Sequence, residues 1–125
     1  MTGRIAATPV EVFLDALASD APTPGGGAVA ALAGASGAAL ISMVCNLTIG
    51  RTGYEEAEER MRGVLDEAEA SRTVLLDLAD RDAAAFGSVM AAFKMPKETD
   101  AERAVRSQAI QEGYSAAAEV PLDIA

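Results

Sequence analysis

The sequence contains no histidine, no tryptophan and only one cysteine, Cys45. Without histidine, proton transfer falls to Asp, Glu, Lys, Tyr or backbone groups, and a zinc site is not expected. A lone cysteine cannot form a disulfide within the chain, which fits a reducing compartment. We therefore predict a cytoplasmic protein that uses no metal and no cofactor.

Aromatic residues are also scarce, at 4% of the chain, although 50% of the residues are hydrophobic. Much of that hydrophobic share is alanine, which has the highest helix propensity, whereas strands favour β-branched and aromatic residues. The 125 residues are enough for one domain. This composition predicts a single all-α domain, a helical bundle in which small side chains let the helices pack closely.

Basic residues are few: 10 Lys and Arg stand against 19 Asp and Glu, giving a net charge of -9 and a pI near 4.3. Nucleic acids and anionic membrane surfaces both select basic proteins, so neither is an expected partner. An anionic small ligand remains compatible with this charge, because a few arginines and a helix N-terminus determine the potential within one pocket.

Periodic apolar residues predict helices in most of the chain. Thr8, Pro9 and Glu11 form a capping box that begins the first helix, and Thr99 with Glu102 forms a second. The long central helix, at roughly 60 Å, exceeds the span of a compact monomer and is expected to bend or to lie along a partner. The predicted helices cover residues 9–20, 28–49, 54–94 and 99–120, and residues 121–125 resemble the start of another helix in a longer chain.

The helix over residues 28–49 carries no charge, which also raises the possibility of a membrane span. About half of the run is Gly, Ala or Ser, and these residues contribute little to insertion. We therefore favour a buried helix in which Ala30, Gly34 and Ala38 form a face for close packing, and we predict no membrane span.

Asp82 is the candidate catalytic residue that the pattern itself suggests. It lies four residues after Leu78 and four before Phe86, on the apolar stripe of the long helix. A carboxylate held away from water is costly unless paired, and such groups are common among proton-transfer residues. A structural carboxylate, paired with an arginine or a helix end, is an equally good interpretation of the pattern.

A glycine-rich loop leads directly into the uncharged helix. Free amides at a helix start bind anions, and glycine lets a ligand approach the backbone, although a flexible connector explains the same residues. Three polar residues at the predicted helix ends are further candidates for ligand contact, with hydrogen bonding or charge pairing at the helix end as the alternative. These candidates are Thr23, Pro24, Gly25, Gly26 and Gly27 in the loop, and Asn46, Arg51 and Lys94 at the helix ends.

Several ordered segments resemble the cyclodeaminase/cyclohydrolase family, which includes the C-terminal domain of formiminotransferase-cyclodeaminase and stand-alone methenyltetrahydrofolate cyclohydrolases. The resemblance covers nearly the whole chain, and it departs at Ala28, where the family commonly has serine. Family members also continue beyond the length of this chain, so the resemblance implies a domain, residues 1–125, without its C-terminal helices. The matching segments are Pro22–Ala31, Asn46–Gly50, Asp82–Phe86, Lys94–Lys97 and Ala118–Leu122.

The resemblance implies a homodimeric folate enzyme that interconverts formimino-, methenyl- or formyltetrahydrofolate, with a formiminotransferase as a further partner. It implies that Asp82 carries out acid–base chemistry or stabilises a cation, and that the loop, Asn46, Arg51, Phe86 and Lys94 bind the reduced folate. The competing hypothesis is a helical interaction module without catalysis, which predicts neither folate binding nor any loss from the substitution Asp82→Asn.

Overall fold

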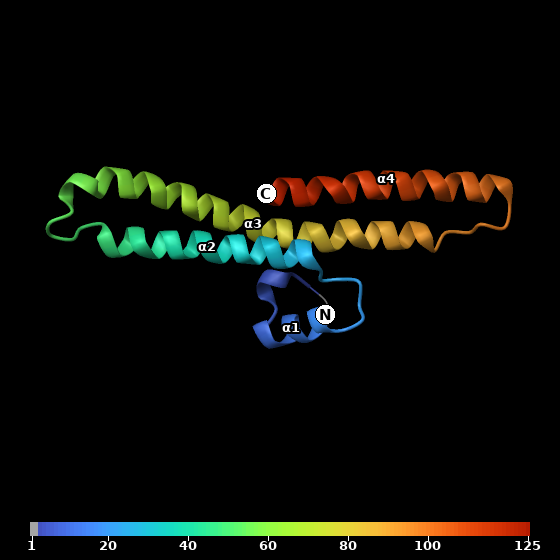
Figure 1. Cartoon of the computed structure of the whole chain (residues 1–125), viewed down its shortest axis with the longest axis horizontal. Coiled ribbons are helices and arrows are strands. Elements are labelled where there is room, and N and C mark those ends of the chain that lie inside the picture. Colours follow the sequence, from blue (N-terminus) through green and yellow to red (C-terminus); the bar gives the residue numbers. More distant parts are fainter. Residues whose placement is uncertain (1–2) are drawn as a thin grey trace.

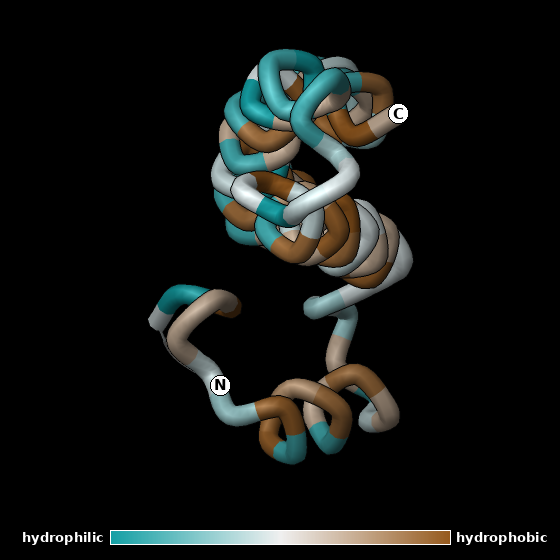
Figure 2. Tube along the Cα trace, turned by 90° about the vertical axis from the view of Figure 1, so that its left-hand side faces the viewer, coloured by the Kyte–Doolittle hydropathy of each residue, from teal (hydrophilic) through white to brown (hydrophobic). Residues whose placement is uncertain are grey.

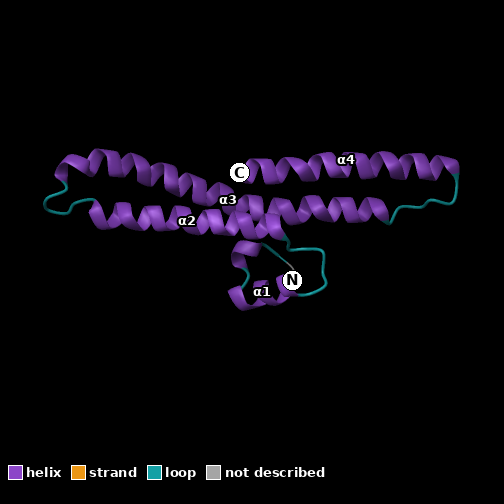
Figure 3. Cartoon of the chain, in the orientation of Figure 1, coloured by secondary structure: helices purple, strands orange, loops and turns teal. Residues whose placement is uncertain are grey.

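The computed structural model describes residues 3–125, which form helices joined by loops and contain no strand (Figures 1 and 3). This confirms the all-α prediction. The α-helices are α1 (Val10–Ala18), α2 (Gly26–Thr48), α3 (Glu58–Phe93) and α4 (Asp100–Ile124), and two short 3₁₀ turns, η1 (Ile5–Ala7) and η2 (Glu55–Ala57), precede α1 and α3.

The long helix α3 is the central element, and both α2 and α4 pack against it. Its 36 residues span about 54 Å at the usual helical rise. α2 runs back along the first half of α3, and α4 runs back along the second half, so the chain is elongated (Figure 1). The start of α2 and the end of α4 therefore meet near the middle of α3. The predicted long central helix is confirmed.

The main hydrophobic core lies where these elements meet. Viewed along the long helices, α1 stands to one side and carries hydrophobic residues of its own (Figure 2). Phe13 of α1 is buried and Leu17 packs against the core, whereas Val10 and Leu14 are exposed. The core residues are Ile5, Phe13, Ala28, Ala31, Leu78, Ala79 and Val120.

α2 buries a face of small residues against α3 that coincides in part with the predicted one, because Ala38 of that prediction is buried. Ala30 is exposed, and Gly37 has open space around it. Gly34 does approach α3, since a Cβ atom there would lie 3.0 Å from Leu75 Cδ1. The register of α2 against α3 selects the buried residues of α2, which are Ala28, Ala31, Ala35, Ala38, Ser42 and Cys45.

The expectation of a buried α2 holds for one face only. The helix is long and apolar enough to cross a membrane, with a mean hydropathy of 2.0, and 33% of its most apolar window is buried. A core helix of a soluble protein passes the same test. The remaining surface of α2 exposes large aliphatic side chains, among them Leu40, Val44 and Leu47.

The two predicted capping boxes have different outcomes. Thr99 Oγ1 accepts a hydrogen bond from Glu102 N–H at 3.1 Å, and Glu102 accepts from the Thr99 amide, so the box that begins α4 is confirmed. The predicted capping box at Thr8 is wrong. Pro9 caps α1 without a side-chain bond, and the Thr8 hydroxyl donates to the Arg4 carbonyl because Thr8 closes η1 instead.

The end of α4 also differs from the prediction. α4 does not stop at Val120 but continues through Pro121 to Ile124. Val120 is buried in the core, and this burial holds the last turn despite the proline. Arg81 of α3 lies 3.7 Å from Asp123, but both side chains are more than half exposed, so this pair adds little.

Ion pairs on α3 contribute little to this fold. Arg72 donates to Glu69 one turn earlier, and this hydrogen bond holds the pKa of the Glu69 carboxyl below its ordinary value. Both side chains are about two-fifths exposed, and such pairs contribute about 0–1 kcal/mol. The apolar contacts between helices therefore account for most of the stability.

Candidate functional site

The glycine-rich loop opens onto a cavity at the meeting point of α2, α3 and α4. The cavity has a volume of about 340 Å³, which lies in the usual range for small-molecule sites. The loop and the first turn of α2 form one wall, Asp82 and Phe86 of α3 form the second, and α4 forms the third. The lining residues are Pro22, Thr23, Gly25, Gly26, Gly27, Asp82, Phe86, Ala117 and Pro121.

The start of α2 brings free amides to this cavity. Gly25 is the N-cap, and no side chain caps the helix. The first amides of a helix have no intrahelical acceptor, and the aligned peptide dipoles add partial positive charge there. The glycines leave this end of the helix uncovered, so a ligand can approach the backbone directly.

Asp82 lies against this helix start and is half-buried. A Cβ atom at position 27 would overlap the carboxylate, so only glycine fits at Gly27 while Asp82 keeps its place. The structure thus brings together the two features that the sequence singled out, the inward aspartate and the glycine-rich helix start.

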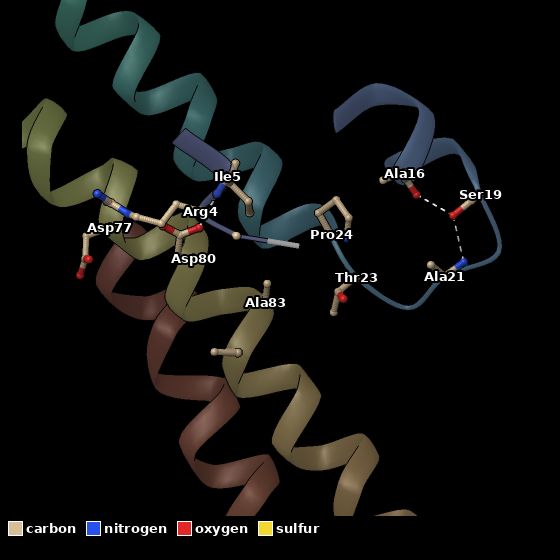
Figure 4. A pocket seen from close by; sticks show the side chains of 12 residues that line it. Arg4, Ile5, Ala16, Ser19, Ala21, Thr23, Pro24, Asp77, Asp80 and Ala83 are labelled. Atoms are coloured by element: carbon tan, nitrogen blue, oxygen red, sulfur yellow. Dashed lines mark hydrogen bonds and ion pairs between the residues drawn. The ribbon is translucent and has the colours of Figure 1, made fainter. Parts of the chain in front are cut away.

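A second, larger cavity of about 670 Å³ adjoins the first, with Thr23 in the wall of both. Here the N-terminal segment crosses α3 (Figure 4). The Ile5 amide donates to Asp80 Oδ1 at 2.7 Å, and Arg4 Nε donates to Asp80 Oδ2 at 3.2 Å. Pro24 is buried and lines this second cavity rather than the first. Asp80 therefore anchors the N-terminal segment, which lines this cavity together with Thr23 and Pro24 of the loop.

The sequence model of the family described as formiminotransferase-cyclodeaminase matches residues 9–125. The chain belongs to this family. The match includes every element that forms the first cavity, and it confirms the resemblance that the ordered motifs indicated.

Individual relatives support the assignment. A methenyltetrahydrofolate cyclohydrolase of Methylorubrum extorquens is 52% identical over 113 residues, which cover 90% of this chain and 54% of that protein. The formimidoyltransferase-cyclodeaminase of Rattus norvegicus is 40% identical over 116 residues, covering 93% of this chain and 21% of that protein.

A crystal structure of formiminotetrahydrofolate cyclodeaminase from Thermotoga maritima shares the fold, with a TM-score of 0.80 and 36% identity. The similarity covers 97% of this chain and 56% of that one. The chain thus spans about half the length of the two bacterial relatives.

Within a single copy of the chain, three of the predicted ligand-binding residues lie away from the cavity. Asn46 and Arg51 are near the far end of α2, about 28 Å along the helix from Gly27 in the case of Asn46. Lys94 follows the last turn of α3, about 18 Å beyond Asp82. All three are exposed, and their predicted roles stay predictions.

Sequence reasoning assigned no role to the third wall of the cavity. Ala117 and Pro121 lie on one face of α4 because they are four residues apart. Pro121 was predicted to begin a separate helix, so a continuous helical face that joins it to Ala117 was not expected. A proline at four-residue spacing from a small residue was the available signal.

Proposed function

We propose that this chain carries the catalytic cavity of a folate one-carbon enzyme that acts on formimino- or methenyltetrahydrofolate. One observation carries the proposal: the Asp82 carboxylate lies against the uncapped glycine start of α2, in the wall of a ligand-sized cavity. The names of the relatives, a cyclohydrolase and two cyclodeaminases, supply the substrate class.

The chemistry of both reactions suits a carboxylate beside a helix N-terminus. In the hydrolysis, water adds to the cationic methenyl carbon, one carbon–nitrogen bond breaks, and a proton is released. In the deamination, the anilino nitrogen attacks the formimino carbon, and ammonia leaves after gaining a proton. Asp82 would accept or deliver that proton and would stabilise the cationic carbon. No cofactor besides the folate is required.

The Phe86 ring and the loop amides would hold the folate in place. Phe86 follows Asp82 by one turn of α3, and its side chain is 39% exposed where it borders the cavity. An exposed aromatic ring offers a stacking surface to a flat heterocycle. The free amides of α2 would donate to an acceptor on the same ring system.

Hydrolysis of methenyltetrahydrofolate, followed by the decay of its absorbance, tests the proposal with the substitution Asp82→Asn. The variant keeps the shape of the side chain but cannot take up the proton, so we expect turnover to fall by roughly 10²–10⁴-fold. Asp66→Asn is the matched control, because Asp66 is an exposed carboxylate on the same helix, and its turnover should equal that of the wild type.

Unchanged turnover in Asp82→Asn would remove Asp82 from the mechanism. A wild-type chain that neither binds nor converts reduced folates would instead favour the non-catalytic helical module.

The proposal extends to the assembly. We propose a homodimer that forms through the exposed aliphatic side of α2, and a formimidoyltransferase as the partner that supplies formimino-folate. The name of the rat relative joins those two activities in one protein. One exposed stripe of α2 includes Leu40, Val44 and Leu47, each more than half exposed. We propose that a second copy of the chain buries this stripe.

A further inference from the structure

The third wall of the cavity contains a proline inside a helix. Pro121 lies within α4, which continues to Ile124. Proline has no N–H, so the carbonyl of Ala117, four residues earlier, loses the donor that a helix would normally give it. Both Ala117 and Pro121 line the cavity, and the carbonyl oxygen lies between them along the helix.

A carbonyl without its helical donor is a strong acceptor that still needs a partner. Elsewhere such a group on a helix surface is hydrated, but Ala117 lines a cavity whose wall also includes Asp82 and the glycine start of α2. The three walls thus offer donors on one side, a carboxylate on the second and a neutral acceptor on the third. This arrangement is complementary to a flat ring that has acceptors at one edge and N–H donors at another.

We propose that the Ala117 carbonyl, freed by Pro121, accepts a hydrogen bond from an N–H donor of the bound ring system. This inference rests on the proposed function, in which the ligand is a reduced folate whose aminopyrimidinone edge carries such donors. Pro121 acts as a positioning residue, since it keeps the Ala117 carbonyl available and its own ring only borders the site.

α4 stays helical at Pro121 without any contribution from a ligand. The burial of Val120 in the core holds the turn in place. Replacing Pro121 with a residue that has an N–H would therefore restore the helical hydrogen bond without moving the helix. Such a variant should be more stable and yet bind folate less well, an outcome that a purely structural role does not predict.

The test compares Pro121→Ala with Pro121→Val in the full chain. Both variants restore the N–H, but valine keeps much of the volume of the proline ring. We expect both to raise the KM for methenyltetrahydrofolate and the Kd for 5-formyltetrahydrofolate about tenfold, the loss of one hydrogen bond, with kcat changed less. Thermal denaturation should show a higher Tm for both. Gly63→Ala, which raises helix propensity on α3 in open space, is the control for added stability alone.

If both Pro121 variants bind folate as tightly as the wild type, the inference is wrong. It is also wrong if Pro121→Ala weakens binding and Pro121→Val does not, because that result assigns the effect to the proline ring. The proposed function fails separately, if the wild type itself does not bind 5-formyltetrahydrofolate.

Discussion

At the residue scale, the contact between Gly27 and Asp82 makes a sharp prediction. The substitution Gly27→Ala should place a methyl group where the carboxylate lies and push Asp82 aside. Because a shift of about 1 Å in a catalytic group can cost about 10²-fold in rate, we expect turnover of methenyltetrahydrofolate to fall by at least that factor.

Gly63→Ala is the control for this substitution. Gly63 lies inside α3, and a Cβ atom there meets nothing within 4 Å. The change should leave turnover intact and stabilise the helix by about 1 kcal/mol, which thermal denaturation measures. If Gly27→Ala retained full activity, the carboxylate would not need its present position.

The inward position of Asp82 could be predicted from the sequence, whereas its contact with Gly27 could not. Helical periodicity places Asp82 on the side of Leu78, and Leu78 is indeed buried. The contact depends on how far α2 slides along α3, and that register depends on which small residues of α2 meet Leu75 and Leu78. For the same reason the predicted face of α2 is confirmed at Ala38, which is buried, and wrong at Ala30, which is exposed.

At the element scale, the two threonine caps form a matched pair. Thr99→Ala removes the oxygen that accepts from the Glu102 amide, so it should destabilise the protein by about 1 kcal/mol. Thr8→Ala removes only an exposed bond to the Arg4 carbonyl and should cost less than about 0.5 kcal/mol. Thermal or urea denaturation of both variants checks the difference, and equal losses would mean that the Thr99 box does not hold the start of α4.

The sequence predicts which segments are helical more accurately than it predicts where each helix begins and ends. The alanine-rich stretches and three-to-four-residue periods marked α2, α3 and α4 within a few residues. Local signals misplaced two ends. Thr8 serves a preceding 3₁₀ turn that sequence reasoning did not include, and Pro121 stays helical because the burial of Val120 outweighs the proline.

At the scale of the whole molecule, the side-chain sizes along the exposed stripe of α2 are uneven. The stripe recurs at three- and four-residue steps and is small in its first half, with Ala33 and Ser36, and large in its second half, with Leu40, Val44 and Leu47. The Ser36 hydroxyl donates to the Leu32 carbonyl of its own helix, so it does not require solvent.

A two-fold axis near the middle of α2 would make this stripe self-complementary. In an antiparallel pair of α2 helices, Ser36 of one copy faces Leu40 of the other, and Ala33 faces Val44, so two of the large side chains meet small ones, while Leu47 lies near Val29. A parallel pair would oppose Leu40 with Leu40 and leave gaps between the small residues. The exposed stripe therefore favours an antiparallel homodimer.

Two valines of nearly equal exposure, one on the stripe of α2 and one outside it, allow the proposed interface to be tested. Val44 on the stripe is 55% exposed, and Val74 on α3 is 57% exposed. In the proposed dimer, Val44→Lys would bury two ammonium groups in the interface, so we expect this variant to be monomeric in sedimentation or light-scattering measurements. Val74→Lys should form the proposed dimer as the wild type does. A monomeric wild type at micromolar concentration, or a dimer that survives Val44→Lys, would contradict the α2 interface, because neither result is compatible with this stripe lying between two copies.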